Sequence, residues 1–175
     1  MNIPLYNKRK IINDPVYGFI SVPGEIQFDL IEHPWFQRLR RIKQLGLTYL
    51  VYPGAYHTRF QHALGAMHLM GQAIEVLRQK GQAIGVDEEN GLLNAILLHD
   101  IGHGPFSHAL ESSITEAMSH EDISLLCIDR MNVAMNGRLD MARNIFAGDD
   151  SGKFLRQLVS SQLDVDRLDY LKRDS

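Results

Sequence analysis

The chain has 175 residues, of which 45% are apolar and 22% charged, a composition that indicates one folded domain with a globular core rather than a disordered tail. Its 18 Lys and Arg against 21 Asp and Glu give a net charge of −3, so neither nucleic acid nor a membrane is indicated as a partner. A single Cys127, no apolar run of spanning length and no signal-peptide pattern favour a reducing, cytoplasmic setting.

Residues 11–24 are predicted to form a short β-hairpin, because Asp14-Pro15 disfavours helix and Pro23-Gly24 signals a turn after residues suited to strands. From Pro34 to Leu45, apolar residues recur at helical spacing with basic residues between them, which predicts a helix with a solvated charged face. A short extended stretch is expected from Tyr49 to Tyr52.

The middle of the chain carries the clearest helical patterns. An apolar stripe with a period of 3.6 residues over 63–77 predicts a helix that closes near Gly81. The segment from Asp87 to His99 has an acidic first turn and is apolar nearly all round, so we expect a central buried helix that is broken by Gly102, Gly104 and Pro105. Further helices are predicted over residues 107–118, 122–135, 139–147 and 152–174.

These elements predict an all-α fold, a helical bundle with a small N-terminal β-hairpin arm. We expect one domain over residues 1–175, with the arm in 1–33 and a helical, metal-binding core in 34–175. The last segment is still amphipathic at Ser175, so we expect the natural polypeptide to continue beyond it.

His99 and Asp100 lie at the end of the most apolar helix, where an unpaired carboxylate is costly. An ordinary helix end with a solvated Asp is the alternative, but His62 lies on the inward stripe of the preceding helix. Two inward imidazoles and a carboxylate suggest a metal, and residues 163–170 offer closely spaced acids for a further ligand. Such a donor set suits one divalent transition metal, Mn, Fe, Zn or Ni, and leaves positions free for water or substrate.

A His, then His-Asp, then a distant Asp resembles the motif of the HD superfamily of metal-dependent phosphohydrolases. Five ordered blocks are similar to the deoxynucleoside triphosphate triphosphohydrolases of that superfamily, the dGTPase-like branch that includes a protein joining a sterile alpha motif to an HD domain. The blocks are residues 36–46, 53–55, 59–62, 99–108 and 164–170.

The resemblance implies a set of site residues. The metal ligands are then His62, His99, Asp100 and Asp166, with Asp164 a neighbouring non-ligand. Substrate contacts are implied for Gln44 and Leu45 beside the sugar, Arg59 at the α-phosphate, Arg167 at a distal phosphate, and Tyr170 and Asp174 around the sugar. Ordinary surface ion pairing is the alternative for the two arginines.

A second set suits acid–base work. His103 lies one turn beyond His99, and His108 and Glu111 are spaced i, i+3 on the predicted next helix. The resemblance implies that His103, His108, Glu111 and His120 position the attacking water and protonate the leaving oxygen, although some relatives carry Asp in place of Glu111. Taken singly, a histidine such as His108 or His120 is more often a surface residue without a functional role. We interpret His33, His57 and His68 in that way.

We therefore expect the protein to hydrolyse deoxynucleoside triphosphates, dGTP among them, to deoxynucleoside and triphosphate. Besides the transition metal of the site, a Mg ion bound to the nucleotide is a further cofactor to consider. The alternatives are a nucleotidase or phosphodiesterase with the same metal site, and a nucleotide-sensing regulator without turnover. The resemblance also implies that the protein is a homo-oligomer. It further implies a nucleotide activator that contacts Glu32, Gln37 and Arg40, for which the alternative is that residues 32–43 form a solvated charged face.

Overall fold

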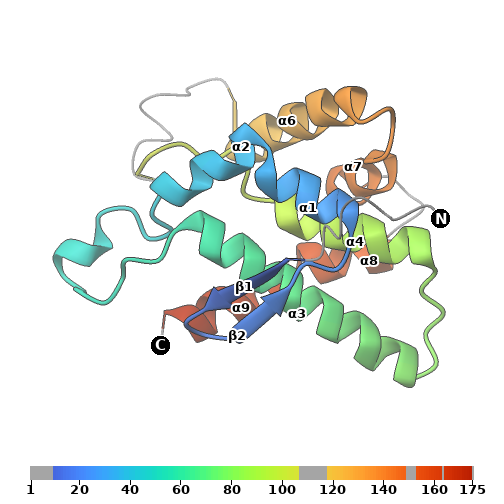
Figure 1. Cartoon of the computed structure of the whole chain (residues 1–175), viewed down its shortest axis with the longest axis horizontal. Coiled ribbons are helices and arrows are strands. Elements are labelled where there is room, and N and C mark those ends of the chain that lie inside the picture. The colour runs from blue at the N-terminus through green and yellow to red at the C-terminus, as the bar shows by residue number, and fades with distance from the viewer. Residues whose placement is uncertain (1–9, 107–117, 149–152, 163, 175) are drawn as a thin grey trace, which may run out of the picture.

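The structure is a computed structural model, and it describes residues 10–106, 118–148, 153–162 and 164–174. Within these residues the fold is helical with a single two-stranded hairpin, which confirms the predicted fold class (Figure 1). The elements are β1 (Ile11–Asp14), β2 (Gly18–Ser21), α1 (Glu25–Glu32), α2 (Pro34–Gln37), η1 (Arg38–Arg41), η2 (Thr48–Leu50), α3 (Arg59–Gln79), α4 (Val86–Leu98), α6 (His120–Ala134), α7 (Asp140–Ala147), α8 (Lys153–Val159) and α9 (Val165–Arg173). No described helix is long and apolar enough to cross a membrane.

The hairpin is antiparallel, as predicted, and pairs Ile11 with Ser21 and Asp14 with Gly18. Its turn is closed by the Asp14 carboxylate, whose Oδ1 accepts from the backbone N–H of Val16 at 2.9 Å and of Tyr17 at 3.1 Å. Asp is favoured at such turns because its side chain can replace a backbone acceptor. The hairpin packs on α3, and Asp14 at its turn contacts Arg173 of α9 (Figure 1).

The predicted helix from Pro34 to Leu45 is only partly present. It begins at Pro34 as α2, tightens into the 3₁₀ helix η1 and ends at Ile42, whose backbone is extended. The Ile42 carbonyl accepts from Arg59 N–H at 2.9 Å and Lys43 bridges to Thr58, so this stretch pairs with the start of α3 instead of continuing the helix. The sequence prediction did not include α1.

The expected extended stretch from Tyr49 to Tyr52 is wrong. Thr48 to Leu50 form the 3₁₀ helix η2, because the Thr48 carbonyl accepts from Val51 N–H at 2.9 Å and from Tyr52 N–H at 2.8 Å. These local turn bonds use the backbone groups that a strand would need for pairing.

Helices α3 and α4 form the centre of the fold, and both match their predicted ranges closely. Thr58 caps α3 with a capping box that includes Gln61, and α4 buries every residue from Gly91 to Leu98. Helix α4 packs against α3 on one side and α7 and α8 on others. Gly91 permits the close approach of α7, because a Cβ there would lie 2.3 Å from Met141 Cγ.

The C-terminal half contains α6 and α7 where helices were predicted, but residues 152–174 form two helices instead of one. Asp164 is the reason for the break. Its carboxylate accepts from Arg167 N–H and from Ser161 N–H, each at 2.7 Å, so it caps α9 and holds the preceding turn. The helix predicted over 107–118 lies outside the described residues.

Candidate metal centre

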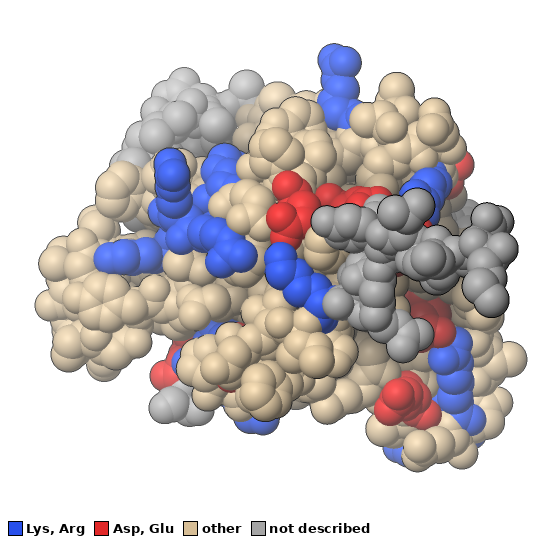
Figure 2. Space-filling view, viewed as in Figure 1, with Lys and Arg blue, Asp and Glu red and all other residues tan. Residues whose placement is uncertain are grey.

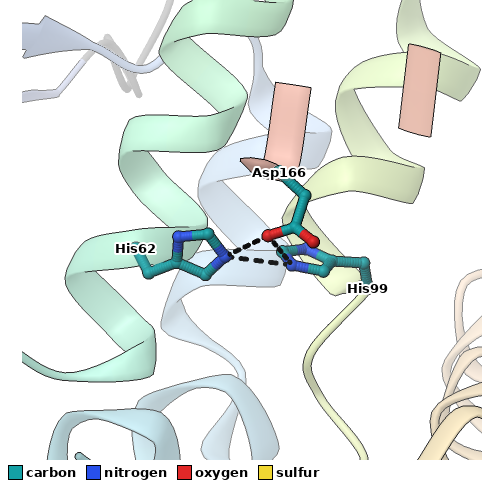
Figure 3. A group of neighbouring side chains, drawn as sticks. All are labelled: His62, His99 and Asp166. Atoms are coloured by element: carbon teal, nitrogen blue, oxygen red, sulfur yellow. Dashed lines mark hydrogen bonds and ion pairs between the residues drawn. The ribbon is translucent and has the colours of Figure 1, made fainter. Parts of the chain in front are cut away.

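Three helices bring His62, His99 and Asp166 together. His62 lies in the first turn of α3, His99 is the residue that ends α4, and Asp166 lies in the first turn of α9. The Nε2 atoms of the two histidines are 3.1 Å apart, and Asp166 Oδ1 is 2.9 Å from His62 Nε2 and 3.5 Å from His99 Nε2. Figure 3 shows the three side chains pointing toward one point.

Asp100, the remaining predicted ligand, lies beside this group. Its oxygens are 3.8 Å from His62 Nε2 and 3.6 Å from His99 Nε2, and Oδ2 also accepts from Arg59 at 2.5 Å. The chain turns directly after His99, so that these neighbours can face one site, as the glycines of this turn predicted.

These separations fit a cation. Ligand atoms about 2.1 Å from a divalent ion and at right angles to one another are about 3.0 Å apart. The three measured contacts of 2.9, 3.1 and 3.5 Å are close to that value. The residues present can therefore hold one metal ion, and its identity is not decided by two imidazoles and two carboxylates.

The electrostatic environment favours positive charge at this point. Burial lowers the pKa of His99, but the carboxylates of Asp100 and Asp166 outweigh burial and raise the pKa to about 9. Burial likewise lowers the pKa of His62, and its bonds to Asp166 and Asp169 more than offset that effect. Burial raises the pKa of Asp100, but the neighbouring His99 and His103 bring it well below its usual range. A divalent cation supplies the same positive charge between these carboxylates.

Asp169 contacts the metal group from behind, and the sequence assigned it no role. It is completely buried, and its Oδ2 lies 2.7 Å from His62 Nδ1, on the side of the ring away from the metal group. A carboxylate in this position orients a ligating imidazole and fixes which nitrogen carries the proton. The signal was present, since Asp169 follows Asp166 by three residues and shares its helix face.

The turn after His99 is held by α6 and η1. Ser124 donates its hydroxyl to the His99 carbonyl at 2.9 Å and accepts from Gly102 N–H at 2.9 Å. Arg38 donates to the carbonyls of Ile101 and His103, the latter at 2.8 Å. Gly102 is required for this contact, because a Cβ would lie 2.3 Å from the carbonyl oxygen at the start of α6.

Two of the predicted acid–base residues lie at the metal group. His103 is buried with Nε2 3.3 Å from Asp100 Oδ1, and its ring stacks on that of His120 with centroids 4.0 Å apart. Burial lowers the pKa of His103, with Asp100 opposing that shift. His108 and Glu111 lie outside the described residues, so their roles stay predictions.

A cleft of about 380 Å³ opens onto the metal group. Five of the six residues predicted to contact substrate line it, namely Gln44, Leu45, Arg59, Tyr170 and Asp174. Gln44 Oε1 is buried and has no hydrogen-bond partner among the described residues. Arg167 is exposed and does not line the cleft, whereas Arg156 of α8, which the sequence reasoning did not identify, does.

The predicted activator residues lie away from the cleft and bind one another or neighbouring groups. Glu32 pairs with Lys10 at 2.6 Å, and Gln37 accepts from Arg40 Nε at 2.7 Å. The Arg40 guanidinium also lies 3.6 Å from the centroid of the Phe60 ring. Figure 2 shows Lys and Arg side chains gathered over α2 and η1, so a basic surface is present, and its ligand stays a prediction.

Comparison with known proteins gives a consistent result. The model of the HD domain family matches residues 59–174. The chain is 39% identical to the uncharacterized protein YwfO of Bacillus subtilis over 97% of this chain and 40% of that protein. It is 36% identical to the deoxynucleoside triphosphate triphosphohydrolase SAMHD1 homolog of Dictyostelium discoideum, over 95% of this chain and 36% of that protein.

A solved structure agrees with the fold. The crystal structure of a phosphohydrolase from Bacteroides thetaiotaomicron superposes with a TM-score of 0.92 at 59% identity, and the match covers 95% of this chain and 41% of that one. The chain thus spans 36% to 41% of the length of these three proteins.

Proposed function

Because the chain belongs to the HD domain family, whose relatives include phosphohydrolases, we propose that it hydrolyses deoxynucleoside triphosphates to deoxynucleoside and triphosphate. The observation that carries this proposal is the shared cleft. The metal group, the Arg59 guanidinium and the acceptor Gln44 face one cavity, so that a phosphate chain and a sugar can be bound together.

Each part of the cleft suits one part of such a substrate. Arg59 is held by Asp100 beside the metal group, where its fork can reach a phosphate oxygen. Gln44 offers an acceptor for a sugar hydroxyl, and Tyr170 and Asp174 line the same wall. His57 Nε2 lies 3.0 Å from Asp174 Oδ1.

A bound divalent cation supplies positive charge against the phosphoryl oxygens and makes water more acidic. His103, next to Asp100 and stacked on His120, lies where it can orient a water for attack. We assign the proton for the leaving 5′ oxygen to His108, with Glu111 as its orienting partner. A 5′ alkoxide is a poor leaving group, so such a proton is expected to contribute about 10² to 10⁴ in rate.

The test is product identification after incubation with each deoxynucleoside triphosphate and Mn²⁺ in water labelled with ¹⁸O. Attack on the α-phosphorus yields unlabelled deoxynucleoside and triphosphate that carries the label in one terminal phosphate. Release of single phosphate or pyrophosphate refutes the proposal and supports a nucleotidase or phosphodiesterase. Tight nucleotide binding without any product supports a sensing role instead.

A further inference from the structure

The buried side chains behind His62 form a continuous series that reaches the β1–β2 turn. Arg173 lies one turn after Asp169 on α9 and binds both oxygens of that carboxylate, with Nε 2.9 Å from Oδ2 and the terminal nitrogen 3.0 Å from Oδ1. A two-point contact fixes the plane of the carboxylate as well as its position.

The series continues from Arg173 to the hairpin. The second terminal nitrogen of Arg173 donates to Asp14 Oδ2 at 3.0 Å, and these two side chains are 1% and 3% exposed. Asp14 uses its other oxygen, Oδ1, to close the turn at Val16 and Tyr17. One carboxylate therefore joins the hairpin turn to α9.

The packing around this series is close. Gly65 lies on α3 one turn after His62, and a Cβ there would be 2.0 Å from Asp169 Oδ1 and 2.3 Å from an Arg173 nitrogen. The side chains of Asp169 and Arg173 thus occupy the space that a side chain at position 65 would take. Burying one cation between two carboxylates costs desolvation free energy that apolar side chains would not require.

We propose that Asp14 and Arg173 are positioning residues of the metal centre, which act through Asp169 to hold the His62 ring with Nε2 toward the metal. The inference rests on the proposed metal-dependent function. Without Arg173 the Asp169 carboxylate could rotate, and without Asp14 the guanidinium would lose the contact that sets its own position. The hairpin is then part of the metal centre and not only an arm on its surface.

Asp14→Asn tests this selectively. The amide oxygen can still accept from Val16 and Tyr17, while its NH₂ group faces the Arg173 guanidinium in place of Oδ2. Mn²⁺ affinity of the protein is measured by competition with a chromophoric chelator. Loss of an outer partner of a metal ligand typically weakens metal binding about 10- to 100-fold, and we expect a loss of this size for Asp169→Asn. For the more distant Asp14→Asn and Arg173→Lys we expect a smaller but measurable loss of about 3- to 10-fold.

Two further measurements separate positioning from a merely structural role. The visible spectrum of the Co²⁺-loaded protein should change in these variants, and circular dichroism should show that each is folded. Glu89→Gln is the matched control, because Arg78 and Glu89 form an ion pair of 2.7 Å on the surface. It should leave Mn²⁺ affinity and the Co²⁺ spectrum unchanged.

Folded Asp14→Asn and Arg173→Lys variants with wild-type Mn²⁺ affinity and Co²⁺ spectrum would overturn the inference, even if their thermal stability falls. A wild-type protein that binds Mn²⁺ and hydrolyses no deoxynucleoside triphosphate refutes the proposed substrate but leaves this inference open to the same measurements. A wild-type protein that binds neither Mn²⁺ nor Co²⁺ overturns both.

Discussion

Gly65→Ala is expected to destabilise the protein although alanine is the better helix former. The new methyl group would meet Asp169 Oδ1 at 2.0 Å, Arg173 at 2.3 Å and Tyr17 Cε2 at 2.8 Å. All three distances are shorter than van der Waals contact, so α3 and α9 must separate or the buried ion pair must shift.

The magnitude follows from three terms. Overpacking of a core costs about 1–3 kcal/mol. Displacing one member of a buried ion pair costs about 3–5 kcal/mol. Replacing Gly by Ala in a helix gains about 1 kcal/mol. The lower end of the sum is about 3 kcal/mol, which for a chain of this length lowers Tm by roughly 6–12 °C.

Gly71→Ala on the same helix is the matched control, since nothing lies within 4 Å of a Cβ there. Only the helix preference remains, so a gain of about 1 kcal/mol and a rise in Tm of roughly 2–4 °C are expected. The assay is thermal unfolding of both variants by circular dichroism in the presence of a chelator. If Gly65→Ala raises Tm as Gly71→Ala does, the close packing of α3 on α9 is wrong.

Elemental analysis should find about one transition metal ion per purified chain, and an Asp100→Ala, His62→Ala double variant should lose it. Equal metal content in the wild-type protein and the double variant would show that the metal-centre assignment is wrong. Removal of the metal by a chelator should lower Tm, because an ion that binds only the folded state stabilises it. Equal Tm values for the metal-free and the fully metal-loaded protein would contradict this. Gly102→Ala should destabilise by more than about 3 kcal/mol, because its methyl group meets backbone atoms of α6 at 2.3 and 2.5 Å, whereas Gly104→Ala has open space and should change stability little. Arg156→Gln should raise KM for a deoxynucleoside triphosphate with little change in kcat, since Arg156 lines the cleft; if Arg167→Gln has that effect instead, the distal phosphate lies where the sequence resemblance placed it.

Local patterns account for much of the fold. The 3.6-residue apolar stripe before Gly81 and the apolar run before His99 predicted α3 and α4 to within a few residues, because long periodic segments determine their own helix. Asp14-Pro15, which disfavours helix, and the neighbouring residues suited to strands predicted the hairpin, whereas its turn lies at residues 15–17 and not at the predicted Pro23-Gly24. Short segments were less predictable, because η2 and the break at Asp164 each depend on a pair of local hydrogen bonds that a periodic pattern does not contain.

The candidate site divides in the same way. His99 and Asp100 were recognisable because a carboxylate beside a histidine at the end of an apolar helix, followed by glycines, needs a partner or a metal ion. The contacts behind the ligands were not recognisable, because they arise from helix packing: His62 and Asp169 are 107 positions apart, and Asp14 and Arg173 are 159 apart. Arg156 likewise carries no local mark and reaches the cleft only because α8 packs against α4.

The sequence by itself determined which residue types could bind a metal and which segments would be helices, since both follow from chemistry and periodicity within a few residues. Only the tertiary structure decided that Asp169 contacts His62, that Arg173 joins it to the hairpin, and that Arg167 lies outside the cleft. The physical reason is that such contacts depend on how closely two helices approach. Where α3 meets α9, Gly65 leaves the space that the side chains of Asp169 and Arg173 occupy.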